Sequence, residues 1–163
     1  MVRLFDRLEL ASDLFVKGEY KAVIPVLERI LDADAFNLDA MLRLATSYSA
    51  IGHDRLALAT FRRAAAIAPQ SADVRLYLGL HYAKGKDWAQ AAPLLEQAVA
   101  DFPDRLPALE GLAAVRERQG RIDDAIGLRQ KVISLQVPAA AELAHLGEEL
   151  GQGAGDGGET HAV

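Results

Sequence analysis

The sequence has no cysteine, few aromatic residues and no excess of positive charge. Without cysteine, disulfides, thiolate metal sites and a cysteine nucleophile are excluded. The net charge of −5 argues against DNA or RNA as the main partner, because binding phosphates needs a basic surface. Aromatic residues make up only 6% of the 163 residues, whereas Ala and Leu are abundant. Since Ala and Leu favour helices, this composition predicts a helical protein.

Long apolar runs are also missing, and no stretch approaches the roughly 20 residues that a membrane-spanning helix needs. The first residues lack the basic region and apolar run of a signal peptide. We therefore expect a soluble chain without membrane insertion. Arg outnumbers Lys by 13 to 5, which together with the abundant Ala indicates a GC-rich bacterial source. Since no signal peptide is recognised, we expect the bacterial cytoplasm as its location. The periplasm stays open if a signal or an upstream domain belongs to a longer parent protein.

What the chain does have is an internal repeat with a constant period. A leucine recurs at equal intervals, at Leu10, Leu44, Leu78, Leu112 and Leu146. A small residue follows each of these leucines: Ala11, Ala45, Gly79, Ala113 and Gly147. Further columns recur in step, including Val23, Ala57, Ala91 and Ala125, and then Leu27, Phe61 and Leu95. Such a period is the mark of a repeat protein, in which successive units stack into one continuous core.

The pattern of apolar residues within one unit predicts a pair of antiparallel helices. Leu44, Tyr48 and Ile51 fall at helical spacing, as do Ala57, Phe61 and Ala64 in the next segment. Between the two segments, Gly52 supplies the left-handed residue that often ends a helix. Pro69 and Pro103 are expected to end the second helix of their units, because proline disfavours helix at the residue before it.

These columns resemble the tetratricopeptide repeat. Residues 38–71 match best, through Leu44-Ala45, Tyr48, Ala57, Phe61, Ala64 and Pro69, and residues 72–105 match nearly as well. Residues 4–37 and 106–139 are weaker but in phase. The resemblance implies an all-α, right-handed α-solenoid of four helix-turn-helix repeats, covering residues 1–150 with nine helices and no strand. The ninth, at 139–150, is expected to cap the last repeat. Residues 151–163 form a Gly-rich segment that predicts a flexible tail.

The fourth repeat departs from the pattern of its neighbours. Arg116 stands where the repeat usually has Tyr, and Arg129 stands where it usually has Phe. We therefore expect a core in this repeat that is thinner and partly ionic.

No constellation in the sequence indicates catalysis, a metal or a cofactor. The four histidines lie in separate units without the spacing of metal ligands. The glycines of the tail lack the strand and helix that a phosphate-binding loop requires. Neighbouring carboxylates such as Asp123 and Asp124 point about 100° apart on a helix and do not share a site. The chain is expected not to be an enzyme and to bind no cofactor.

The resemblance places function in a concave groove lined by the first helix of each repeat. Its groove columns fall on mainly apolar side chains in the first three repeats and on charged ones in the fourth. The candidates are Phe5, Leu8, Phe15, Leu42, Thr46, Leu76, Leu80, Lys84, Glu110, Glu117 and Arg118. An exposed apolar stripe usually marks an interaction site, and an amphipathic or extended apolar peptide would suit it.

Two functions follow from the resemblance. The first is a non-catalytic scaffold that binds an apolar or amphipathic segment of a partner protein. The alternative is an accessory or oligomerisation domain within a larger bacterial protein, such as an enzyme with appended repeats, or a scaffold that associates with itself. The two differ in whether the occupant of the groove comes from another protein, from the same polypeptide or from a second copy.

Overall fold

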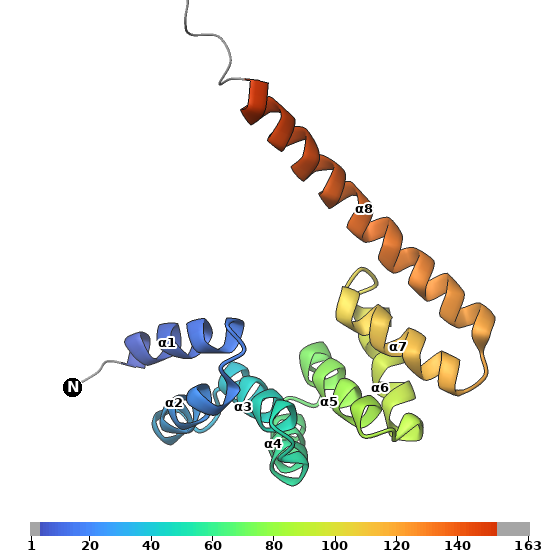
Figure 1. Ribbon diagram of the computed structural model, residues 1–163. Coiled ribbons are helices and arrows are strands. Elements are labelled where there is room, and N and C mark those ends of the chain that lie inside the picture. Colours follow the sequence, from blue (N-terminus) through green and yellow to red (C-terminus); the bar gives the residue numbers. More distant parts are fainter. Residues whose placement is uncertain (1–3, 153–163) are drawn as a thin grey trace, which may run out of the picture.

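The computed structural model describes the backbone of residues 4–152 and the side chains of residues 5–137. Over this part the chain forms eight helices and no strand (Figure 1). The helices are α1 (Leu4–Val16), α2 (Tyr20–Ala33), α3 (Leu38–Ala50), α4 (Asp54–Ile67), α5 (Ala72–Lys84), α6 (Trp88–Asp101), α7 (Leu106–Arg118) and α8 (Ile122–Gln152). Two helices begin in each predicted repeat, each pair follows the previous one along the array, and only α8 runs past the end of its repeat. The expected all-α solenoid is confirmed.

The expectation of nine helices is wrong for the described residues. Residues 139–150 do not begin a helix of their own but continue α8, which runs through Pro138 to Gln152. A proline removes only one backbone donor, and the alanines that follow favour helix strongly. Pro25 and Pro93 likewise lie inside α2 and α6. Of the predicted tail, residues 151–152 belong to α8, and residues 153–163 lie outside the described part.

Side-chain caps and prolines set the ends of several helices. The side chains of Asn37, Ser71 and Asp87 accept hydrogen bonds from the backbone N–H three residues ahead, at the starts of α3, α5 and α6. The second helices α4 and α6 end two residues before Pro69 and Pro103, as the sequence predicts.

The turn inside each repeat needs one residue with a positive φ. Gly18, Gly52 and Gly120 take this position, with φ of 73°, 81° and 76°. In the third repeat the same column holds Lys86, at φ 63°, although Gly85 stands next to it. A side chain in this left-handed conformation is strained, whereas glycine adopts it freely.

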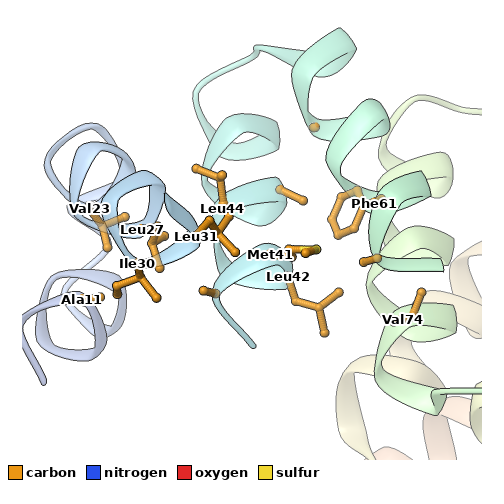
Figure 2. Close-up of a cluster of buried hydrophobic side chains, with 14 of the residues drawn as sticks. Ala11, Val23, Leu27, Ile30, Leu31, Met41, Leu42, Leu44, Phe61 and Val74 are labelled. Carbon is orange, nitrogen blue, oxygen red and sulfur yellow. The ribbon is translucent and has the colours of Figure 1, made fainter. Parts of the chain in front are cut away.

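The repeating columns form the core between the helix layers. Figure 2 shows Leu31 of α2 and Leu44 of α3 side by side, with Ala11 and Ile30 on one side of them and Met41 and Phe61 on the other. Ala45, Ala57 and Phe61 are all at most 1% exposed. The small residue after each leucine allows close approach, because a Cβ at Gly79 would lie 2.9 Å from Leu95 Cγ. Shape as well as apolarity therefore fixes how the two helices of a repeat pack on each other.

The fourth repeat is partly ionic, as its sequence predicts. Arg116 is only 9% exposed, and its guanidinium donates to Glu96 Oε1 at 2.5 Å and to Gln119 Oε1 at 2.9 Å. Arg129, in the column of Phe61 and Leu95, is exposed and pairs with Glu117 at 2.7 Å. The core contact that Phe61 and Leu95 make is thus missing here.

None of the described helices is long and apolar enough to cross a membrane. Within the described residues, no three His, Asp or Glu side chains gather in a way that could hold a metal ion.

Candidate functional site

Two hollows lie next to each other over the first helices of the first three repeats. The first, of about 550 Å³, is lined by Phe15, Val16, Leu38, Asp39, Leu42, Arg43, Thr46, Asp73, Tyr77 and Arg105. The second, of about 440 Å³, is lined by Thr46, Ser49, Ala50, Phe61, Tyr77, Leu80, His81 and Lys84. Thr46 of α3 and Tyr77 of α5 line both. We call the two hollows together the groove.

The first hollow combines apolar walls with an ionic rim. The guanidinium of Arg43 pairs with Asp39 at 2.7 Å and lies 5.3 Å from the ring centre of Phe15. Across the hollow, Arg105 pairs with Asp73. Both cations are therefore already neutralised, and a ligand gains little from carrying an anion here. What a ligand can still cover is the apolar surface of the walls.

The second hollow has an apolar wall and one polar corner. Leu80 and Phe61 contribute the apolar side, and the corner lies at the C-terminal end of α3. There the Lys84 ammonium donates to the carbonyl oxygen of Ser49, which also accepts from the backbone N–H of Gly52 at 3.2 Å. The ammonium also complements the negative end of the α3 dipole. Lys84 thus ties α5 to α3 and is not a free cation.

His81 shares this polar corner. Its Nδ1 lies 3.0 Å from Ser49 Oγ, and its ring centre lies 5.4 Å from that of Phe61. Burial lowers the pKa of His81 below its usual 6.5, and the Lys84 ammonium adds to this, while Asp54 acts in the opposite direction. The imidazole is therefore neutral near pH 7 and offers a ligand one donor or one acceptor without a charge.

Five of the predicted site residues line the groove: Phe15, Leu42, Thr46, Leu80 and Lys84. Leu42 is only 7% exposed, so it contributes to the wall from within the core. The structure brings these five residues, from α1, α3 and α5, to one continuous surface.

The other predicted positions do not line either hollow. Leu76 is 1% exposed and packs in the core with Ala91 and Leu112, because α6 and α7 cover this part of α5. Its assignment to the groove is corrected accordingly. Leu8 packs against the core of the first repeats, and Phe5 is exposed beside it. Glu110, Glu117 and Arg118 lie on α7, where Glu117 pairs with Arg129 and Arg118 covers the Trp88 ring.

The candidate residues from the sequence did not include Arg43, Tyr77 and Arg105, which also line the groove. Arg43 and Tyr77 stand one repeat period apart, so the repeat itself carried the signal that they share a column. The next member of that column is Gly111, where a Cβ would lie 2.6 Å from Leu80 Cδ2. Glycine at this point lets α7 pack closely on α5, which closes the groove after the third repeat.

Comparison with known families agrees with the repeat pattern. A sequence model described as tetratricopeptide repeat matches residues 82–146, and a second with the same description matches residues 39–71. Together the two matches cover more than half of the chain. The chain belongs to the tetratricopeptide repeat family.

Relatives and solved structures point the same way. Tetratricopeptide repeat protein 8 of Caenorhabditis elegans is 25% identical over an alignment of 147 residues, which covers 68% of this chain and 29% of that protein. The chain therefore spans less than a third of this relative. MamA AMB-1 has a TM-score of 0.68 and 28% identity over 78% of this chain and 75% of its own. MamA MSR-1 has a TM-score of 0.68 and 26% identity, covering 83% and 78%.

Proposed function

We propose that this tetratricopeptide repeat protein is a non-catalytic scaffold that binds an amphipathic peptide segment in the groove. The observation that carries the proposal is the continuity of the two hollows through Thr46 and Tyr77. A segment with two apolar anchors on one side, and polar residues on the other, would fill both hollows and leave the ion pairs at the rim intact.

Charge supports an amphipathic segment over a strongly acidic one. Arg43, Arg105 and Lys84 are each engaged with a partner inside the protein. A carboxylate of the ligand would have to displace Asp39 or Asp73, or the Ser49 carbonyl, and would gain little net energy in exchange. Apolar surface removed from water, at about 25 cal/mol per Å², supplies the binding energy instead.

A variant of Thr46 tests the proposal. Thr46→Arg places a long cation at the junction of the two hollows, on a side chain that is partly exposed, so the fold should persist. The matched control is Thr60→Arg, which changes another partly exposed threonine, on α4, that lines neither hollow.

The measurement is binding of peptides selected from a random 16-residue phage library against the unchanged protein, followed by anisotropy titration. We expect selected peptides to share two apolar anchors and to lose at least about tenfold in affinity, or about 1.4 kcal/mol, with Thr46→Arg but not with Thr60→Arg. Peptides that bind both variants equally well would place the binding surface elsewhere and contradict the proposal.

A further inference from the structure

An apolar stripe on α8 is exposed in the described part of the chain. Ile126 is 49% exposed, and Ile133 and Val137 are each 58% exposed. In the three preceding repeats, the residues in the columns of Ile126 and Ile133 are buried or partly buried. These residues are Ile24 and Leu31, Leu58 and Ala65, and Ala92 and Val99. There the next repeat follows and covers them, whereas no helix of the described part of the chain packs on the stripe of α8.

The second half of α8 has the sequence of the helix that is missing. Leu146 and Gly147 continue the Leu-small column of α3, α5 and α7. Leu143 and Leu150 add the helical spacing of an apolar face. The length fits too, because α8 has 31 residues, equal to one 14-residue second helix, a four-residue connection and one 13-residue first helix. Residues 122–152 are thus a second helix and the next first helix joined without a turn.

A straight α8 cannot cover its own stripe. Leu146 lies 13 residues beyond Ile133, which is about 20 Å along a helix. Figure 1 shows the second half of α8 extending past α7 and away from the other repeats. To reach Ile133 within one chain, the helix would have to break at residues 136–139 and lose backbone hydrogen bonds there.

We propose that two copies of this chain associate by exchanging residues 140–152. Each copy keeps α8 continuous, and its second half packs on Ile126 and Ile133 of the other copy, as the first helix of a fifth repeat would. Such an exchange makes the same contacts as closure within one chain, and it is a low-cost route to a symmetric dimer. The exposed stripe of each copy is then covered, and the apolar face of residues 140–152 is buried against it. This surface is separate from the groove.

Repeat symmetry tells which residues meet. Tyr48 Oη donates to Glu28 Oε1 at 2.6 Å, and Arg116 donates to Glu96 in the same two columns, two repeats later. One repeat period beyond this second pair, the columns hold Gln130 and Leu150. In the exchanged dimer, Gln130 of one copy should lie next to Leu150 of the other.

Crosslinking distinguishes exchange from closure within one chain. The chain has no cysteine of its own, so Gln130→Cys with Leu150→Cys can be joined selectively by a short bismaleimide. We expect a covalent product of twice the chain mass, together with a dimer by light scattering before the reagent is added. An internally crosslinked single chain, or a monomer at every concentration up to the millimolar range, would overturn the proposal.

Two further variants separate the interface from other causes of association. Ile126→Glu with Ile133→Glu should raise the dimer dissociation constant by about 100-fold or more, because two carboxylates would face an apolar partner. Leu56→Glu is the matched control, since Leu56 is 50% exposed on α4, and it should leave the dimer unchanged. Replacing residues 136–139 with about eight Gly and Ser residues should permit closure within one chain and give a monomer. Dimers unaffected by the double Glu variant would contradict the exchange.

Discussion

The second and fourth repeats have the same backbone plan but fill it differently. In the second, the Phe61 side chain is 1% exposed and occupies the core, and Tyr48 donates to Glu28 of the first repeat. In the fourth, the Phe61 column holds the exposed Arg129, and the Tyr48 column holds Arg116, which pairs with Glu96 of the third repeat. The contact between neighbouring repeats is thus kept in both, once as a hydroxyl–carboxylate hydrogen bond and once as an ion pair.

The difference shows that a solenoid tolerates loss of core at an end where little packs on it. The Arg129 side chain pairs with Glu117 of α7 and is 56% exposed, because no further helix packs over it in the described part of the chain, so an apolar side chain would gain little burial there. Phe61, by contrast, is surrounded by helices of its own repeat and of the following repeat. Stability should therefore fall from the second repeat toward α8, since each repeat is supported only by its neighbours.

The largest expected effect comes from removing the aromatic core of the second repeat. Phe61→Ala should cost about 3–5 kcal/mol, because it leaves a cavity among buried side chains. Arg129→Ala, in the same column of the fourth repeat, should leave the denaturant midpoint nearly unchanged, because the side chain is exposed. Equilibrium unfolding in urea measures the stability of both variants. Equal losses of unfolding free energy would contradict the difference between the second and fourth repeats.

The leucine column sharpens the comparison at the other end of the array. Leu78 is 8% exposed in the third repeat, whereas Leu10 is 48% exposed in the first. Leu78→Ala should cost about 2–5 kcal/mol, and Leu10→Ala much less, because only the former leaves a cavity. Similar shifts of the urea midpoint at unchanged m-value would contradict stacking of the repeats around one continuous core.

A smaller effect, of opposite sign, is expected in the turn of the third repeat. Lys86 has the φ of 63° in the column where the other three repeats have glycine. Lys86→Gly should raise the free energy of unfolding by about 0.5–1 kcal/mol, because the strain disappears. Gly52→Lys is the reciprocal variant and should destabilise by a similar amount. A Lys86→Gly protein that is less stable than the parent would show that the lysine side chain contributes more than its strained backbone costs.

The smallest effect should appear in alkaline solution. Burial, together with the nearby Glu28 carboxylate, raises the pKa of Tyr48 from 10.0 to about 12. The folded state therefore favours the protonated phenol. Its contribution to stability is complete below pH 10 and is lost as the pH rises toward 12. The free energy of unfolding of Tyr48→Phe should therefore fall less steeply with pH over this range than that of the parent. If the two proteins lose stability in parallel, the loss comes from other groups.

Much of this architecture could be predicted because each repeat independently shows the same pattern. Leu44, Ala45 and Phe61 lie in columns that recur once in every repeat, so burial and helix pairing followed from one pattern. The continuity of α8 could not be predicted, because Pro138 stands close to where the second helices end before Pro69 and Pro103. That pattern contains no sign that the helix would pass through the proline.

The groove was harder to predict than the core. Leu76 and Leu42 occupy the same column, but α6 and α7 cover Leu76, whereas Leu42 reaches the wall of a hollow. Which side chains of a first helix stay accessible depends on how closely the next repeat packs. At α7 this is set by Gly111, a single residue whose effect a column pattern does not reveal.

Hydrogen exchange resolved along the chain tests the decline of stability toward α8 most directly. It should be measured at a concentration where light scattering shows a single chain. We expect the slowest exchange in α3, α4 and α5, faster exchange in α7, and the fastest of these in residues 122–137 of α8. If residues 122–137 are as well protected as α4 under these conditions, a helix covers the α8 stripe within one chain, and both the difference between the repeats and the exchange of α8 are wrong.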